Sequence, residues 1–163
     1  LGDLAIHKLD LLRWILQDEY TQASAFLDTL SKTYPNGQLI DVEDNAHCVL
    51  RTKKGAIGSV IASWTYQKEN NCTTIYCEKG IVQVYVDPQF PLVVHYDHEN
   101  SEYHKVGRQS TNLAQIKSGI VDAFVEALVG DREVPIPGIE GYKALEAVLA
   151  CQQSAKTGNV VNI

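Results

Sequence analysis

Hydrophobic and polar residues follow two different periods along this chain, and the changes of period divide it into three regions. Residues 3–17 are rich in leucine and isoleucine and contain no glycine or proline, which predicts a helix. Short alternating segments follow, and helical spacing returns in the last third of the chain. This order predicts an α+β fold in which helices cover one face of a mixed, mainly antiparallel, open-faced sheet.

The alternating region contains several predicted strands joined by turns. They lie at residues 21–30, 45–52, 56–66, 73–77, 81–86, 92–96 and 103–106. The clearest hairpin joins the second of these segments to the third through a turn at Gly55. Along the third segment, Ile57 and Ile61 share one face, while Val60 and Trp64 share the other. Because helices cover only one face, one of these two apolar sets must be exposed, and an exposed apolar face predicts self-association.

Two amphipathic helices are predicted near the C-terminus. The first has apolar residues at helical spacing, namely Leu113, Ile116, Ile120, Phe124, Ala127 and Leu128. The second begins at the corner 135–138 and ends at Gly158. Its apolar stripe, which we expect to be buried, contains Tyr142, Leu145, Val148 and Leu149.

Length and charge narrow the class of protein. The 163 residues are enough for one domain, and no internal boundary is visible in the sequence. A net charge of −6 without a basic cluster argues against nucleic-acid binding. No apolar run approaches the roughly 20 residues that a membrane span needs. The four cysteines lack zinc-site spacing, and we expect them to be reduced. A cytoplasmic protein is therefore predicted.

The first helix carries an unusual polar stripe. At about 100° per residue, the stripe spans about 60° of the helix and contains Asp3, His7, Asp10 and Trp14. Histidine exchanges protons near neutral pH, and a carboxylate one turn away can orient it. The stripe is thus a candidate acid–base site. A simple exposed polar face remains the alternative, and the spacing alone favours it.

The sequence around this stripe resembles that of a known family. The stretch LGDLAIHKLDLLRW is similar to the pattern Asp-x-Gly-x-His-x-x-Asp-x-x-x-Trp of the Gfo/Idh/MocA oxidoreductases, with Ala5 in place of the usual glycine. Two later stretches resemble the hairpin and the closing helix pair of the same family, in the same order. They are VEDNAHCVLRTKKGAIGSVIASWTY and DAFVEALVGDREVPIPGIEGYKALEAVLACQQSAKTG. Residues 1–163 thus resemble the family's C-terminal, substrate-binding and oligomerisation domain.

The resemblance implies a nicotinamide-dependent dehydrogenase that oxidises or reduces a sugar, inositol or similar polyol by hydride transfer. His7 would be the proton shuttle, and Asp3 would bind a substrate hydroxyl or orient the catalytic group. Trp64 and Thr65 lie where the return strand of the hairpin could approach the substrate, although a Trp64 packed across strands is the alternative.

The other two residues of the stripe have simpler interpretations. Asp10 matches a position that is more often structural, and we expect it to serve helix packing or hydrogen bonding. Trp14 is expected in the core, because a large aromatic residue on a buried helix needs no other role.

The cofactor site is expected outside this chain. A dinucleotide-binding fold carries a Gly-x-Gly-x-x-Gly turn, and the sequence has none. NAD or NADP would be bound mainly by an N-terminal Rossmann domain absent from this chain, so we expect the fragment alone to be inactive. No metal site is predicted. The expected partners are a small-molecule polyol or sugar and further copies of the chain, in a homodimer or homotetramer through the sheet face. The alternatives are a non-catalytic family member and an unrelated structural or oligomerisation module with a similar fold.

Overall fold

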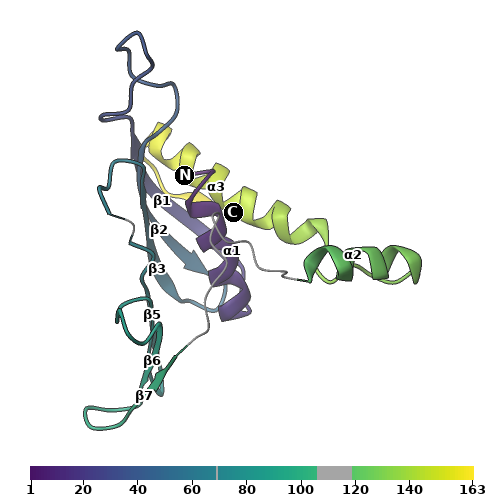
Figure 1. Cartoon of the computed structure of the whole chain (residues 1–163). Coiled ribbons are helices and arrows are strands. Elements are labelled where there is room, and N and C mark those ends of the chain that lie inside the picture. The colour runs from purple at the N-terminus through teal and green to yellow at the C-terminus, as the bar shows by residue number, and fades with distance from the viewer. Residues whose placement is uncertain (69, 106–118) are drawn as a thin grey trace. The chain divides into compact units, whose positions relative to one another are not determined.

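The computed structural model describes residues 1–68, 70–105 and 119–163 (Figure 1). These residues form two compact units. The first, which we call the discontinuous unit, contains Leu1–Tyr66 and Glu126–Ile163. The second, the inserted unit, contains Gln67–Val125. The chain therefore leaves the discontinuous unit once and later returns to complete it, a division that the hydrophobic pattern does not reveal.

The sheet of the discontinuous unit is antiparallel throughout. It contains β1 (Tyr20–Asp28), β2 (Asn45–Thr52), β3 (Ile57–Ser63) and β8 (Val161–Asn162) in the order β3-β2-β1-β8. The predicted hairpin is β2–β3, and Gly55 in its turn has φ of 96°, a conformation that glycine adopts without strain. The two-residue strand β8 was not predicted, because so short a segment shows no alternation.

Helices α1 (Ala5–Leu16) and α3 (Gly138–Thr157) lie on one side of this sheet (Figure 1). Helix α3 packs on β1 and against α1. Between them lies a core whose strand residues alternate as period two requires, for example Ala46, Cys48 and Leu50 of β2. The predicted α+β class, with helices on one face of an antiparallel sheet, is thus confirmed.

The prediction that the apolar stripe of α3 is buried is mostly wrong. Its large members Tyr142, Leu145 and Leu149 are exposed, and only Val148 is buried. The rest of the buried face consists mainly of small residues, namely Ala144, Ala147, Ala150, Cys151 and Ser154. Small side chains allow the helix backbone to approach the strands closely, which larger residues in the same places would prevent.

The opposite face of the sheet carries the exposed apolar set. Val60 is buried, whereas Ile57 and Ile61 are 66% and 54% exposed. Phe26 of β1 lies in register opposite His47 of β2 and is 83% exposed. Of the two sets that the sequence allowed, Ile57 and Ile61 are therefore the ones that point away from the helices.

The inserted unit contains a second four-stranded antiparallel sheet. Its strands are β4 (Thr73–Cys77), β5 (Gly80–Val84), β6 (Leu92–His95) and β7 (Ser101–His104), in sequential order. Val93 is buried within this unit. Strands β4, β5 and β6 match the predicted segments closely, because local turn residues such as Glu78 and Lys79 bound them. Strand β7 begins two residues before the predicted segment 103–106, and residue 106 lies outside the described residues.

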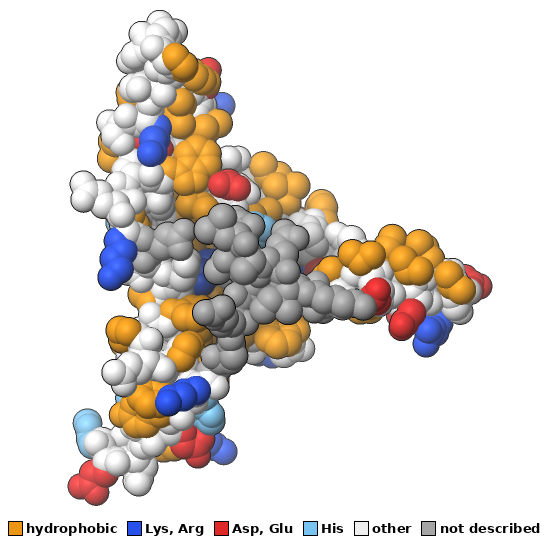
Figure 2. All heavy atoms as spheres, in the orientation of Figure 1, with side chains coloured by type: hydrophobic (Ala, Val, Ile, Leu, Met, Phe, Trp, Pro, Cys, Tyr) orange, Lys and Arg blue, Asp and Glu red, His pale blue; other side chains and the backbone are white. Residues whose placement is uncertain are grey.

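Helix α2 (Ile120–Val129) is shorter than predicted within the described part of the chain, since Leu113 and Ile116 lie outside the described residues. Its surface is strongly apolar (Figure 2), and Ile120, Phe124 and Leu128 are all exposed. Of the described residues in the predicted stripe, only Ala127 is buried. None of the described helices combines the length and apolarity that a membrane crossing needs.

One buried hydroxyl replaces a missing strand contact beside β8. Strand β8 pairs only with Gln22 and Ala23, so the N–H of Ala25 has no strand partner on that side. Instead it donates a hydrogen bond of 3.1 Å to the buried hydroxyl of Ser154, which itself donates to the carbonyl of Asn159 at 2.6 Å. This serine therefore joins α3 to the central strand.

Ser154→Ala should lower the free energy of unfolding by about 1–3 kcal/mol, because it leaves a buried N–H without an acceptor. Urea denaturation is the measurement. Thr157→Ala is the control, since its exposed hydroxyl donates to the carbonyl of Gln153, accepts from the N–H of Asn159 at 3.4 Å and makes no bond to a strand. Equal losses in the two variants would contradict the role given to Ser154.

Candidate functional site

Helix α1 turns its polar stripe away from the core. The buried residues of the helix are Ala5, Leu9 and Arg13, which follow one another at a spacing of four. His7 and Trp14 lie on the other side and are exposed, Trp14 by 69%. The expectation that Trp14 belongs to the core is therefore wrong. The side of α1 that packs against the sheet and α3 is the one that carries Ala5, Leu9 and Arg13, and Trp14 is not on that side. The helix begins at Ala5 and not at the predicted residue 3, so Asp3 precedes it, and Asp3 is exposed as well.

A cleft of about 860 Å³ opens beside this stripe, within the discontinuous unit. Its lining comes from α1, from the two residues before β1 and from the segment that leads into α3. The lining residues are His7, Asp10, Leu11, Arg13, Trp14, Gln17, Asp18, Glu19, Pro135, Ile136, Pro137 and Glu140. Ligand sites for small molecules have volumes of this order and mix apolar walls with a few polar groups.

The cleft brings together some of the predicted residues and not others. His7 and Asp10 both line it, three residues apart on α1. Asp3, Trp64 and Thr65 are not among the described residues that line the cleft. Trp64 instead borders a small hollow beside Leu1 and Leu4 at the start of α1.

Thr65 is tied into the end of the β2–β3 hairpin. Its hydroxyl lies 2.7 Å from that of Ser63 and donates to the side-chain oxygen of Asn45 at 3.3 Å. Its N–H donates to the hydroxyl of Ser63 at 3.0 Å. These bonds fix the backbone directly after Trp64, whose own N–H donates to the carbonyl of Asp44.

Asp44 in turn holds the loop that follows β1. Its buried carboxylate accepts hydrogen bonds from the N–H groups of Leu30, Ser31 and Lys32 at 2.7–2.9 Å. Burial raises the pKa of Asp44, but these donors and the amide of Asn45 outweigh that effect and hold the pKa far below its usual value. The loop is therefore anchored to the ionised side chain of Asp44, and the end of the hairpin to the backbone carbonyl of the same residue.

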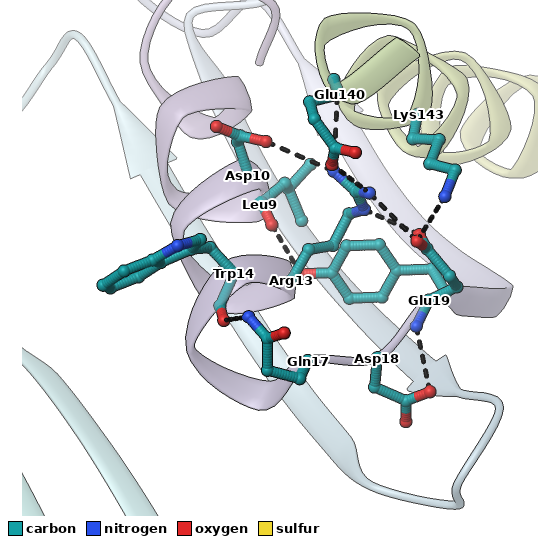
Figure 3. A network of polar contacts seen from close by, with 10 residues as sticks. Leu9, Asp10, Arg13, Trp14, Gln17, Asp18, Glu19, Glu140 and Lys143 are labelled. Atoms are coloured by element: carbon teal, nitrogen blue, oxygen red, sulfur yellow. Dashed lines mark hydrogen bonds and ion pairs between the residues drawn. The ribbon is translucent and has the colours of Figure 1, made fainter. Parts of the chain in front are cut away.

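The sequence did not predict the most connected residue of the cleft, Arg13. Its guanidinium forms a two-pronged pair with Glu19, from Nε at 2.8 Å and from Nη2 at 3.1 Å (Figure 3). Nη2 also donates to the carboxylate of Glu140 at 2.9 Å. Nη1 donates to the carboxylate of Asp10 at 3.2 Å and to the carbonyl of Glu140 at 3.3 Å. Lys143 adds a second cation to Glu19.

These contacts keep the charges of the network in place. The hydrogen bond with Glu19 raises the pKa of Arg13 against the opposing effect of burial, and that with Glu140 adds to it. The same bond from Arg13, with help from Lys143, lowers the pKa of Glu19 to about 2. Nearby, burial raises the pKa of Tyr20, whose hydroxyl donates to the carbonyl of Leu9 at 3.0 Å. Arg13 and Glu19 are therefore both charged at neutral pH, as an ion-pair anchor requires.

An exposed imidazole and a carboxylate in one cleft can exchange protons with a bound hydroxyl compound. Within the described parts of the chain, no group of three or more His, Cys, Asp and Glu side chains is arranged to hold a metal ion. Fold and cleft together define an α+β domain suited to binding a small polar molecule.

Comparison with known families identifies this domain. Residues 1–83 match the family described as the GFO/IDH/MocA C-terminal domain. The chain belongs to this family of oxidoreductases. Comparison with curated proteins gave no significant match.

Solved structures agree over almost the whole chain. The WlbA dehydrogenase from Bordetella pertussis, in complex with NADH and UDP-GlcNAcA, is 25% identical with a TM-score of 0.68, covering 98% of this chain and 43% of that one. An aldose-aldose oxidoreductase from Caulobacter crescentus, complexed with glycerol, is 20% identical with a TM-score of 0.74, covering 99% and 46%. An oxidoreductase domain protein from Kribbella flavida is 18% identical with a TM-score of 0.78, covering 100% and 51%. The chain thus spans about half the length of these structures.

The depressed pKa of Glu19 gives a prediction for acid stability. The ordinary value is 4.5 and the folded value about 2, so its ion pairs contribute stability above about pH 4.5 that is lost as the pH falls towards 2. Relative to Glu19→Gln, the native chain should lose additional stability in that window. Urea midpoints at pH 7, 4.5, 3.5 and 2.5 measure the difference. Parallel losses in the two proteins would show that the Glu19 pairs are not responsible.

Proposed function

We propose that this chain is the substrate-binding domain of a NAD- or NADP-dependent dehydrogenase, acting in the cytoplasm on a sugar, inositol or similar polyol. His7 is the proposed proton shuttle. The observation that carries the proposal is the exposed imidazole of His7 in a cleft that it shares with the carboxylate of Asp10. Membership of the family and the dehydrogenases among the similar structures support the same reaction class.

The residues of this chain do not fit a dinucleotide site. Its sequence has no glycine-rich turn of the kind that cradles a pyrophosphate. We therefore assign the cofactor to an N-terminal Rossmann domain of the complete protein. The bound cofactor would accept or return the hydride, and the residues of this chain would bind the substrate and move the proton.

The proton step follows from the chemistry of an alcohol. When a secondary alcohol becomes a ketone, the carbon loses hydride and the oxygen loses a proton. An alcohol is too weak an acid to release that proton unaided, so a neutral imidazole nitrogen of His7 accepts it as the carbonyl bond forms. In the reverse direction the protonated imidazole donates it to the new hydroxyl.

The remaining predicted site residues have binding roles in this proposal. Asp3 precedes His7 by four residues and is exposed, so its carboxylate is free to accept a hydrogen bond from a substrate hydroxyl or to orient the catalytic group. Trp64 and Thr65 are proposed to contact the substrate from the end of β3.

In the complete enzyme, His7→Ala should lower kcat by about 10²- to 10⁴-fold, the usual contribution of a positioned general base. Cofactor affinity and the melting temperature should change little, since His7 is exposed. Asp3→Asn, which keeps the shape and removes the charge, should mainly raise KM for the polyol. Steady-state kinetics and thermal melts on the same preparations measure all of these. A near-normal kcat in folded His7→Ala would assign the proton transfer to another group.

We also propose that copies of the protein associate through the exposed face of the β1–β3 sheet. This face presents the apolar side chains of Phe26, Val49, Ile57 and Ile61, which are between 47% and 83% exposed. Strand register makes the set continuous, because His47 pairs with both Phe26 and Ile61, and Arg51 with Ile57. A second copy can cover such a self-complementary face about a two-fold axis.

Ile61→Lys should convert the dimer or tetramer of the complete protein to smaller species, because it places a charge on the apolar face. Light scattering at several concentrations measures the mass. Thr157→Lys, an exposed change on α3, is the control and should leave the mass unchanged. A native protein that is monomeric at high concentration would contradict the proposed interface.

A further inference from the structure

Arg13 is bonded to both sides of the cleft. One side is α1, where Asp10 accepts from Nη1 at 3.2 Å. The other side is the start of α3, where Glu140 accepts twice, through its carbonyl at 3.3 Å and its carboxylate at 2.9 Å. Glu19, just before β1, takes the remaining two bonds (Figure 3). One side chain thus spans three elements that line the cleft.

The guanidinium has no donor left for a substrate. An arginine side chain has five N–H groups, and the five hydrogen bonds to Asp10, Glu19 and Glu140 use all of them. The side chain is only 4% exposed. Arg13 therefore cannot act on a bound molecule by direct contact, and any influence on the reaction must pass through the groups that it holds.

Asp10 is the group through which this influence can reach the substrate. Its side chain remains 49% exposed although one carboxylate oxygen is bound to Arg13. It lies three residues from His7, so the two side chains are neighbours on the helix surface and line the same cleft. An unrestrained Asp10 would sample several rotamers, whereas the bond to Arg13 selects one.

We propose that Arg13 is a positioning residue for the polyol reaction. It fixes the carboxylate of Asp10 at the cleft beside His7, and it sets the separation between α1 and the start of α3. This inference rests on the proposed function, since it assumes that the polyol is bound in this cleft.

Lysine cannot replace arginine in this role. Its ammonium carries the same charge, but it has three donors around one nitrogen in place of a planar fork of five. It cannot serve acceptors on α1, before β1 and on α3 together. Arg13→Lys therefore keeps the buried positive charge and removes the geometric restraint, which makes it the informative substitution.

The test uses the complete enzyme, with free hexoses and inositols as the polyol probes. Arg13→Lys should raise KM for the polyol on the order of tenfold, the effect of losing one charge-assisted hydrogen bond. KM for NAD or NADP should stay the same, and kcat should change much less. Lys143→Met is the matched control. It removes the other cation from Glu19, but Lys143 does not line the cleft, so the melting temperature should fall while KM for the polyol stays unchanged.

A double-mutant cycle tests whether Arg13 acts through Asp10. Asp10→Asn should raise KM for the polyol, and adding Arg13→Lys should then cost much less than it does alone. If Arg13→Lys does not fold, the comparison of Asp10→Asn with Lys143→Met still decides, because only the former should change KM.

Three results would overturn the inference. They are an unchanged polyol KM in folded Arg13→Lys or in Asp10→Asn, an equal KM change in Lys143→Met, and strict additivity in the cycle. In each of these cases the wild-type enzyme would still oxidise polyols, so the proposed function would not be contradicted. A wild-type enzyme inactive on every polyol would instead refute the proposed function, and the inference would fall with it.

Discussion

A buried positive charge is the constraint on which the arrangement of α1 depends. Moving a guanidinium out of water costs free energy unless every donor finds an acceptor. Removing one partner from a buried ion pair destabilises the fold further, because it leaves a buried charge without compensation. Arg13 meets this requirement only when α1, the residues before β1 and the first turn of α3 are all in place. The apolar contacts of Ala5 and Leu9 hold the helix against the core, and the charge fixes its rotation and its distance from α3. The outward direction of His7 follows from that rotation.

Most of the fold could be predicted from local patterns in the sequence. Strands β2 and β4 begin and end at the predicted residues, because alternation and turn glycines are properties of a few neighbouring positions. The failures concern distance between elements. Hydrophobicity favours Tyr142, Leu145 and Leu149 as the buried face of α3, but the space above β1 is filled mainly by small side chains, and no local pattern encodes that space. For the same reason, the spacing of the stripe on α1 could be recognised from the sequence, whereas the exposure of Trp14 could not be predicted.

The candidate site was predictable in part. The spacing of Asp3, His7 and Asp10 was visible, since it lies within one short segment of the sequence, whereas the cleft also needs residues 135–140. Arg13 was overlooked because arginine on a helix ordinarily marks the solvent side. A signal for it did exist. Arg13 continues the core line of Ala5 and Leu9 at a spacing of four, and a charged residue on such a line requires buried partners of opposite sign.

The discontinuity of the first unit has a consequence for biosynthesis. Ala25 meets Ser154 and Arg13 meets Glu140, partners separated by 129 and 127 residues. A ribosome releases β1, β2 and β3 long before α3, and the inserted unit emerges in between. The nascent sheet must therefore wait with its inner apolar face uncovered, a state prone to wrong association and suited to chaperone binding. The core closes only when α3 has been made after the inserted unit, so a chain that stalls before α3 would be a target for quality control.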